Sequence, residues 1–493
     1  SESASDGQTP STKPRRRRIT RKWLWDSTPG PIRRCLGPGL EILNPSLLLG
    51  RDFRRQKVFA ERVQRWSAEQ VSAYQLQQLR VLLSCAYEKS AYYRRAFDEH
   101  GFAPQAMKSL GDMRRVPLTD RRLVRQQLEG MCTTSLDSPD VEMVSTGGTS
   151  GEPFRFIHPV GRSAVEYAYL VTSWERAGYQ LGMPMGVLRG RVVEPDRNGF
   201  YHEHDPVLRH HYYGNFHMSD ENMARYLEHI ATIGSCFLHV YPSSVAMLAR
   251  FCLRAGIEPP GNIRGIIAES EIVYPEQRKM VEEVFRCRYF SCYGHTEKLV
   301  LASECEHSHD YHVWPTYGYF ELLDDAGRPV RTPGQRGEIV GTGFINTVMP
   351  FIRYRTGDWA TYVGDRCDAC GREHVLVRDI RGHRTQEVLV TADGSEISWT
   401  ALNMHDDTFM RVRQFQFVQE TRGRAVLHVV PGAGYSDEDA CRIQRNLGRK
   451  LDGQLTFTIE SVEAIMTTAG GKAIYVDQRI PGVQVRDEAT ETP

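Results

Sequence analysis

Short apolar runs alternate with longer amphipathic segments beyond Val141, and this pattern restricts the possible folds of the chain more than any other feature. Residues 183–188 and 263–268 have the length and composition of buried strands. Residues 275–285 carry the apolar spacing of a helix, and a further strand is expected at 289–291. Strands that alternate with helices favour an α/β fold in which helices pack on a mixed sheet.

Other patterns flank this region on both sides. Residues 52–100 repeat their apolar side chains at helical intervals, which predicts helices, and Gly101 ends them. Residues 117–120 predict an extended stretch that ends in a helix cap. Beyond 317 strands dominate and indicate a β-rich subdomain, and an α+β pattern follows from 380. The elements expected there are strands at 320–324, 338–340, 414–419, 425–430 and near Phe457, and a helix at 437–451.

We therefore expect two folded parts with a tail at each end. A large multi-layer N-terminal domain covers 23–379, and a small α+β C-terminal domain covers 380–480. Residues 1–22 are rich in arginine and contain almost nothing apolar, so a disordered basic tail is expected, and 481–493 form a second tail. Trp23, Leu24 and Trp25 follow the basic tail, and the combination allows at most peripheral contact with an anionic membrane.

The composition excludes several classes of protein. The 493 residues carry 62 lysines and arginines against 61 aspartates and glutamates, and this balance argues against a protein that wraps nucleic acid. The chain has no apolar run of about 18 residues and no signal-peptide pattern, so we expect a cytoplasmic protein. The 11 cysteines are expected to be reduced thiols, most of them small core residues.

The first motif with chemical meaning comes directly after the apolar Met143 and Val144. Its glycines permit a backbone path that other residues disfavour, so that successive amides can point at one anion, and its hydroxyls add donors. The motif lacks the Gly-Lys-Ser/Thr ending of a P-loop, and a flexible turn is the alternative interpretation. Its residues are Ser145, Thr146, Gly147, Gly148, Thr149, Ser150 and Gly151.

Three further motifs follow in order along the chain. They are Tyr293-Gly294-His295-Thr296-Glu297, Tyr354-Arg355-Thr356-Gly357-Asp358 and Gly470-Gly471-Lys472. With the first motif, their order and spacing resemble the adenylate-forming superfamily, and within it the phenylacetate–CoA ligases and the CapK-like proteins of capsule and exopolysaccharide clusters. The resemblance covers about residues 61–480, and it is carried by the stretches QLQQLRVLLSCAYEKSAYYRRAF, STGGTSGEP, SCYGHTE, MPFIRYRTGD, CDACGRE, GHRTQE and SWTALNMHDDTF.

The resemblance implies an AMP-forming ligase. Such an enzyme joins a small carboxylic acid to the α-phosphate of ATP, releases pyrophosphate, and passes the acyl group to an amine or to the thiol of coenzyme A. The CapK-like branch implies cell-surface polysaccharide biosynthesis, and an aryl-acid CoA ligase is the alternative. An inactive scaffold stabilised by zinc and a nucleic-acid-binding zinc protein are further alternatives, the last disfavoured by the neutral charge. No specific nucleic acid is expected as a partner, and a homodimer is one candidate assembly.

The resemblance also implies roles for single residues. Residues 145–151 hold the β- and γ-phosphates, Thr296 donates to the α-phosphate, and Glu297 holds Mg²⁺, a hard cation that prefers oxygen ligands. Asp358 offers a pair of acceptor atoms to the ribose hydroxyls, and Lys472, on a mobile C-terminal domain, is the catalytic cation of the first half-reaction. The residues implied around the adenine are Tyr293, Ala268, Glu269 and Ser270, and Gly294 is a further implied ATP-binding residue.

One stretch departs from the pattern of related ligases. Where they carry Gly-Arg-x-Asp-Asp at the hinge between the two domains, this chain has Gly382-His383-Arg384-Thr385-Gln386-Glu387. The usual hinge aspartate is missing, and the arginine that contacts phosphate is either Arg381 or Arg384.

Cys367 and Cys370 form a separate candidate site. Their C-x-x-C spacing is that of zinc ligands, and Gly371 permits the tight turn that brings both thiolates round. A closed tetrahedral site needs two more ligands, and it would then hold a structural zinc. A redox pair and unliganded thiols are the alternatives. The remaining ligands are Cys305 and His312, which the resemblance implies, with His307 and His309 as competitors.

Two polar clusters complete the candidates. In related proteins the histidine-rich stretch 202–217 lies near the acyl pocket, and we interpret its members as ordinary loop histidines, with contact to a polar substrate as the alternative. Residues 403–407 are expected on the mobile domain, where a structural use is favoured over contact with the acceptor.

Overall fold

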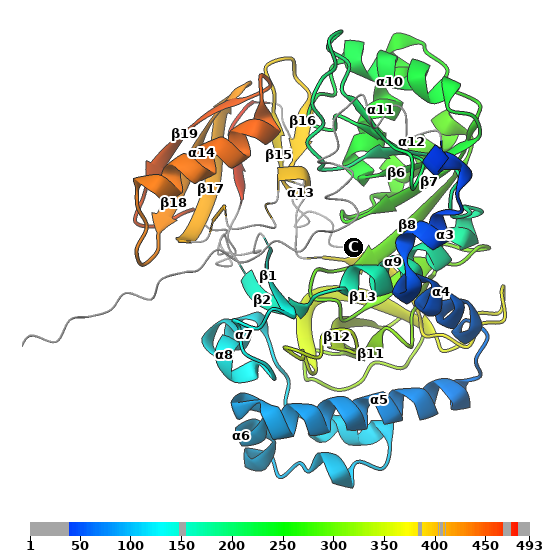
Figure 1. Ribbon diagram of the computed structural model, residues 1–493, viewed down its shortest axis with the longest axis vertical. Coiled ribbons are helices and arrows are strands. Elements are labelled where there is room, and N and C mark those ends of the chain that lie inside the picture. The colour runs from blue at the N-terminus through cyan, green and yellow to red at the C-terminus, as the bar shows by residue number, and fades with distance from the viewer. Residues whose placement is uncertain are drawn as a thin grey trace, which may run out of the picture.

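The computed structural model describes residues 39–146, 154–382, 387–402, 404, 408–409, 411–466 and 475–481 (Figure 1). The helices are α3 (Pro45–Leu49), α4 (Arg51–Val63), α5 (Ala68–Lys89), α6 (Ala91–Glu99), α7 (Arg121–Gln126), α8 (Leu128–Met131), α9 (Arg162–Trp174), α10 (Asp220–Thr232), α11 (Pro242–Ala255), α12 (Pro275–Phe285), α13 (Trp399–Leu402) and α14 (Asp437–Leu451), with short 3-10 turns at Pro104–Ala106, Leu110–Arg115 and Glu175–Ala177.

The strands of the N-terminal part are β1 (Val141–Thr146), β2 (Phe154–Pro159), β3 (Met185–Leu188), β4 (His202–Asp205), β5 (His210–Tyr213), β6 (Cys236–Val240), β7 (Ile263–Glu269), β8 (Arg288–Gly294), β9 (Leu301–Glu304), β10 (Tyr311–Val313), β11 (Gly318–Leu323), β12 (Arg336–Gly343), β13 (Tyr354–Gly364) and β14 (Leu376–Arg381). Those that follow are β15 (Val388–Val390), β16 (Glu396–Ser398), β17 (Val412–Thr421), β18 (Arg424–Pro431), β19 (Thr456–Ser461) and β20 (Val476–Gln478).

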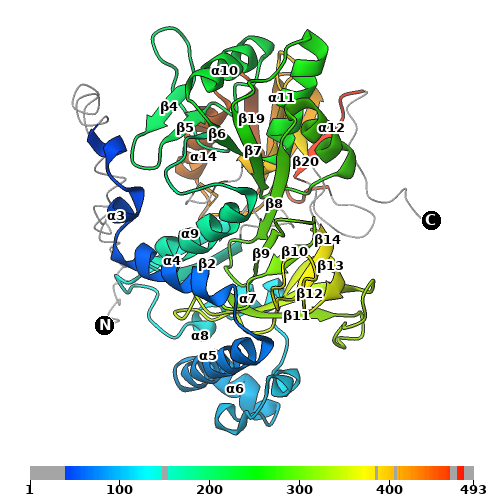
Figure 2. The same ribbon diagram turned by 90° about the vertical axis from the view of Figure 1, so that its right-hand side faces the viewer.

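One large mixed sheet organises the N-terminal part. Within the described residues its order is β11-β12-β13-β14-β10-β9-β8-β7-β6-β3-β5-β4 (Figure 2). The strands β5, β3, β6, β7 and β8 are parallel to one another, whereas β4 at one edge and the run from β9 to β11 pair antiparallel. The sheet therefore joins a parallel, helix-covered half to the β-rich subdomain expected beyond residue 317.

Helices cover both faces of the parallel half because its strands are apolar on both sides. Leu238 and Ile266 pack into a core with α10, α11 and α12. Their chain neighbours Phe237 and Ile267 point to the opposite face and pack into a second core with α4 and α9. This alternation along the strand is what a pleated backbone imposes. The expected α/β class with helices on a mixed sheet is confirmed.

The helical region at 52–100 forms as the sequence predicts, with α4, α5 and α6 in succession. A capping box between Ser67 and Gln70 begins α5. Asp120 caps α7, because its Oδ1 accepts a hydrogen bond from the backbone N–H of Leu123 at 2.7 Å. Residues 117–120 thus form the extended stretch and cap that the sequence indicates.

The C-terminal part forms a smaller α+β unit. The strands β19, β18, β17 and β20 make its sheet, and α14 lies across β17 and β18 (Figure 1). Its core gathers buried residues such as Phe415, Leu427 and Leu447. The strand β14 ends at Arg381, slightly past the expected domain boundary between 379 and 380. Residues 1–22 and 482–493 of the two tails lie outside the described residues. Among the described helices, none combines the length and the apolar composition of a membrane span.

Candidate functional site

One cleft of about 1400 Å³ opens at the carboxyl ends of the parallel strands β7 and β8, beside the start of β13. Side chains of the C-terminal part, Trp399 and Thr400 among them, line its other side. Ligands in α/β folds commonly bind where parallel strands end. The predicted site residues that line this cleft are Glu269, Ser270, Tyr293, Gly294, Thr296, Glu297 and Asp358.

Tyr293 and Asp358 are joined by a hydrogen bond across the cleft wall. The Tyr293 hydroxyl, at the end of β8, donates to Oδ2 of Asp358, in β13, at 2.8 Å. Burial, together with the nearby Asp358 carboxylate, raises the pKa of Tyr293 well above its ordinary value, so the phenol keeps its proton. Two motifs separated by 65 residues therefore form one polar unit in which an acceptor is held in place by a donor.

Thr296 and Glu297 follow β8 directly and also face the cleft. His158, in β2, lies against this turn, and its Nε2 bonds to the Thr296 carbonyl at 2.9 Å. Burial lowers the pKa of His158 to about 4, so the ring is neutral and its Nε2–H can donate. Because β2 pairs with β1, His158 also ties this turn to the strand that leads into residues 145–151.

Glu297 supplies oxygen ligands of the kind that Mg²⁺ prefers. Its side chain is half-buried at the cleft and makes no ion pair with another described residue. The adjacent Lys298 is instead paired with Glu166 of α9. A cleft carboxylate that has no cationic partner within the described part of the chain fits a cation site.

Glu269 has partners that the sequence did not indicate. Its carboxylate accepts from the Trp174 Nε1–H at 2.8 Å, from Arg189 at 2.8 Å, and contacts His239 Nε2 at 3.2 Å. Although burial favours the neutral acid, His239 and Arg189 hold the pKa of Glu269 far below its ordinary value. A carboxylate engaged in this way is an anchor for the cleft wall, and its place beside an adenine stays a prediction.

The remaining nucleotide-site predictions have different outcomes. Ala268 is fully buried in β7 and is not among the lining residues. Arg381 is likewise absent from the described lining, although Ile380 and Gly382 on either side of it are present. Ser145 and Thr146 end β1. The predicted residues Gly147, Gly148, Thr149, Ser150, Gly151, Arg384 and Lys472 lie outside the described residues.

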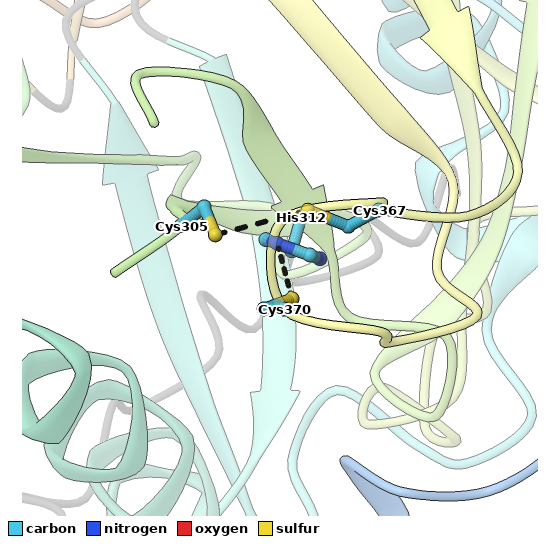
Figure 3. Close-up of side chains that lie close together, drawn as sticks. All are labelled: Cys305, His312, Cys367 and Cys370. Atoms are coloured by element: carbon cyan, nitrogen blue, oxygen red, sulfur yellow. Dashed lines mark hydrogen bonds between the residues drawn. The ribbon is translucent and has the colours of Figure 1, made fainter. Parts of the chain in front are cut away.

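The four predicted zinc ligands come together in one cluster (Figure 3). Cys305 follows β9, His312 lies in β10, and Cys367 and Cys370 occupy the turn between β13 and β14. Their ligand atoms all lie within 4.8 Å of one another, and His307 and His309 are not in the set. Three of the four side chains are buried.

The distances in this Cys₃His cluster fit a tetrahedral metal. Cys305 Sγ and Cys367 Sγ are 3.8 Å apart, and Cys370 Sγ is 3.5 Å from His312 Nε2. Zinc–sulfur bonds of about 2.3 Å and zinc–nitrogen bonds of about 2.0 Å at tetrahedral angles give edges of about 3.8 and 3.5 Å. The site is thus pre-shaped for the ion that its ligand types favour.

The surroundings of the Cys₃His cluster hold the ligands in position. The backbone N–H of His307 points at Cys305 Sγ at 3.4 Å. Gly371, with a positive φ of 74°, closes the turn through its N–H to the Cys367 carbonyl at 2.8 Å. Arg372 is buried and paired with Glu306 at 2.5 Å. Three thiolates on a divalent ion would leave a negative site, and the nearby guanidinium would offset part of that charge.

The histidine-rich stretch does not form the loop that the sequence suggested. His202 and His204 lie in β4, and His210 and His211 lie in β5. Burial, with the neighbouring histidines, lowers the pKa of His202 and of His211 to about 3. None of these four lines the described cleft, so contact with its substrate is not supported. Of the cluster at 403–407, only the buried Met404 is described.

Arg189, His239 and Trp174 are cleft residues that sequence reasoning missed. Arg189 carried a usable signal, because a charged residue directly after the buried run 185–188 marks the end of a parallel strand. His239 lies within an otherwise apolar strand, and Trp174 ends a helix, so neither position stood out.

Comparison with known proteins identifies relatives. No protein-family model matches the chain. It is 25% identical over 327 residues to a phenylacetate-coenzyme A ligase of Thermus thermophilus, covering 65% of this chain and 72% of that protein. It is 26% identical over 301 residues to a phenylacetate-coenzyme A ligase of Pseudomonas putida, covering 59% and 66%. It is 22% identical over 348 residues to protein CapK of Staphylococcus aureus, covering 68% and 74%.

Solved structures share the fold. A 2-hydroxyisobutyryl-CoA ligase in complex with 2-HIB-AMP and CoA, in its thioesterification state, has a TM-score of 0.54 and 19% identity, and the match covers 85% of this chain and 92% of that one. The same ligase in its postadenylation state, with 2-HIB-AMP, has a TM-score of 0.53 and 20% identity, covering 84% and 91%. At this identity the likeness establishes the architecture.

Proposed function

We propose that this chain, a relative of the phenylacetate-coenzyme A ligases and of CapK with the fold of adenylate-forming ligases, activates a carboxylic acid with ATP and transfers the resulting acyl group to an acceptor. The relatives and the fold support an AMP-forming ligase. The identity of the acid, the acceptor and the roles of single residues are part of the proposal.

The observation that carries the proposal is the position of Tyr293, Thr296, Glu297 and Asp358 on one cleft wall. Two segments that are far apart in the sequence contribute to it, because β8 and the turn after it supply Tyr293, Thr296 and Glu297, and β13 supplies Asp358. A donor, a cation ligand and an oriented acceptor pair are together what a Mg²⁺-nucleotide requires. Electrostatic groups fixed before the reaction cost no reorganisation when charge develops.

The first half-reaction breaks the bond between the α- and β-phosphates of ATP and forms one between the acid's carboxylate and the α-phosphorus. Asp358 is proposed to accept from the ribose hydroxyls, with the Tyr293 hydroxyl holding it in position at 2.8 Å. Thr296 is proposed to donate to the α-phosphate. When bound at Glu297, Mg²⁺ would offset the charge of the phosphate oxygens. Residues 145–151 are proposed to surround the β- and γ-phosphates.

Lys472 completes the proposed machinery from the sequence alone. It stands in Gly470-Gly471-Lys472, and related ligases carry a lysine at this place on a C-terminal domain that moves between two half-reactions. An ammonium group there offsets the negative charge that builds up as pyrophosphate leaves.

Coenzyme A is the acceptor that we propose first. The phenylacetate-coenzyme A ligases among the relatives are named for this acceptor, and the 2-hydroxyisobutyryl-CoA ligase was solved with CoA. The similarity to CapK supports a role in cell-surface polysaccharide assembly, in which an amine is the alternative acceptor.

The Cys₃His cluster is proposed to bind a structural zinc. All four positions of a tetrahedron are filled by protein ligands, which is the pattern of a structural rather than a catalytic site. The cluster joins the ends of β9 and β10 to the turn between β13 and β14. Because Asp358 lies in β13 and Tyr293 in β8, a fixed relation between these strands also fixes the proposed nucleotide site.

A pyrophosphate-exchange assay over a panel of aryl, uronic and amino acids tests the proposal. The purified protein with ATP, Mg²⁺ and the correct acid should incorporate labelled pyrophosphate into ATP, and the rate should depend on the acid. ATP binding by calorimetry without exchange on any acid would favour an inactive scaffold. Absence of both would contradict the proposed nucleotide site.

A further inference from the structure

We infer a second metal site, built from His202, His211 and His229, for a borderline divalent ion such as zinc. The ligand atoms of these three side chains all lie within 4.8 Å of one another. None of the three lines the described cleft, and none belongs to the Cys₃His cluster. The inference is therefore independent of the ligase activity proposed above.

The strand register brings the three rings to one face. In the antiparallel pair of β4 and β5, His202 lies opposite Tyr213 and His204 lies opposite His211. Residues two apart on a strand share a face, so His202 and His211 project on the side where Tyr213 packs. Tyr213 belongs to the core shared with α10, and His229 comes from that helix. Three elements thus converge on one point.

The distance between two of the rings fits a shared ion. His202 Nε2 and His211 Nδ1 are 3.1 Å apart. Two nitrogens bound at about 2.0–2.1 Å to a tetrahedral ion are separated by about 3.4 Å. In the metal-free pair, one proton lies between these nitrogens. An ion that binds both takes its place, and the proton moves to the other nitrogen of its own ring.

The third ring is held in a suitable orientation by Tyr213. The fully buried Tyr213 hydroxyl lies 2.9 Å from His229 Nδ1. With Nδ1 engaged in this bond, Nε2 is the nitrogen left for a metal. A polar partner on the far nitrogen is the arrangement that orients histidine ligands in metal sites. His204 adds a further restraint, because its ring stacks on His211 with centroids 4.3 Å apart.

The three histidine ligands determine which metal ions the site prefers, and their positions determine which elements a bound ion would link. Three imidazoles favour zinc, copper, nickel or cobalt over the hard ions calcium and magnesium. All three side chains are partly exposed, so solvent can reach the site and a water or a small anion can take the fourth position. The bound ion would link the edge strand β4 to β5 and to α10. We commit to zinc and use cobalt as its spectroscopic probe.

Cobalt titration of the intact protein, after dialysis against a chelator, separates the two sites. The Cys₃His cluster gives sulfur-to-cobalt charge-transfer absorption, whereas a three-histidine site gives d–d bands without it. We expect two equivalents of cobalt per chain, one of each type, and competition of both by zinc. A single equivalent with thiolate absorption alone would overturn the inference.

Single substitutions test whether the three histidines bind the second equivalent of cobalt. His229→Gln and His211→Gln should each weaken it at least tenfold, and Tyr213→Phe should weaken it by about 10- to 100-fold through the lost partner on Nδ1. His217→Gln is the matched control, because this histidine of the same stretch stacks on Tyr201 instead, and it should bind as the wild type does. Retained thiolate absorption shows that each variant is folded. Unchanged binding in His229→Gln and His211→Gln would refute the site.

Discussion

Two different substitutions of Asp358 distinguish the effect of losing its proposed contact with the ribose from the effect of losing its hydrogen bond to Tyr293. The Tyr293 hydroxyl donates to Asp358 Oδ2 at 2.8 Å in a partly buried position. Asp358→Asn keeps an oxygen that can accept this bond and removes the charge and one acceptor. Asp358→Ala removes both acceptors and leaves the tyrosine hydroxyl without its partner. The two variants therefore differ in stability and share a loss of nucleotide contacts.

The expected sizes follow from the bonds that each variant loses. A hydrogen bond to a charged group contributes about 1.5–3 kcal/mol, which corresponds to about 10- to 150-fold in affinity. We expect ATP affinity to fall at least tenfold in Asp358→Asn and further in Asp358→Ala. The unpaired Tyr293 hydroxyl should also lower the free energy of unfolding of Asp358→Ala by about 1–3 kcal/mol, whereas Asp358→Asn should stay close to wild type.

Calorimetric titration with ATP and Mg²⁺, combined with urea unfolding, measures both quantities. Tyr93→Phe serves as the control, because it also removes a buried hydroxyl, one that donates to the Pro350 carbonyl at 2.7 Å, but at a place outside the cleft. That variant should lose stability and keep its ATP affinity. Unchanged ATP binding in Asp358→Ala would refute the proposed place of the nucleotide.

Three further predictions concern other parts of the proposal. Cys367→Ser should lower bound zinc and the melting temperature before it alters chemistry, and elemental analysis of wild-type protein with well under one zinc at the Cys₃His cluster would contradict the site. Lys472→Ala should slow pyrophosphate exchange by about two orders of magnitude while a supplied acyl-adenylate is still transferred at a near-normal rate, and equal losses in both assays would contradict a role confined to the first half-reaction. Burial lowers the pKa of His158 to about 4 in the folded protein, whereas the ordinary pKa of histidine is about 6.5. Above pH 6.5 the ring is neutral in both the folded and the unfolded state. As the pH falls from 6.5 towards 4, only the unfolded state takes up the proton, so the free energy of unfolding decreases. Between pH 7 and pH 5 the wild type should therefore lose about 2 kcal/mol more unfolding free energy than His158→Gln, and parallel pH profiles from urea unfolding would contradict this.

Elements with marked ends could be predicted from the sequence. The helix α12 spans the predicted residues because Pro275 begins it and Arg286 ends it in a left-handed conformation. The helix α14 matches its predicted span, and a capping box between Ser436 and Asp439 fixes its start. The run at 263–268 forms β7 because residues that are apolar on both sides suit a strand covered by helices on both faces.

The strands β4 and β5 could not be predicted, because their residues are His-Glu-His-Asp and His-His-Tyr-Tyr. Neither sequence alternates apolar with polar side chains, and nothing in them indicates that Tyr213 packs into the core shared with α10. A composition so rich in histidine suggested a loop. Here the pairing of one strand with the next, rather than local preference, determined the structure.

In the candidate site, too, residues in local sequence motifs could be predicted, whereas contacts between distant segments could not. The motifs at Tyr293 and Asp358 were found because each has a recognisable local pattern. The partners of Glu269 could not be predicted, because Trp174, Arg189 and His239 come from three other segments whose spacing carries no signal. Only the fold reveals that this carboxylate is already occupied.

Direct detection of the acyl-adenylate tests the central claim. The wild-type protein is incubated with ATP, Mg²⁺ and the acid that gives the fastest exchange, first without and then with coenzyme A, and the products are identified by mass spectrometry. We predict a protein-bound acyl-AMP in the first reaction, and AMP with the acyl-CoA thioester in equal amounts in the second. Release of ADP and phosphate, or formation of the thioester with no adenylate under any condition, would contradict an AMP-forming ligase.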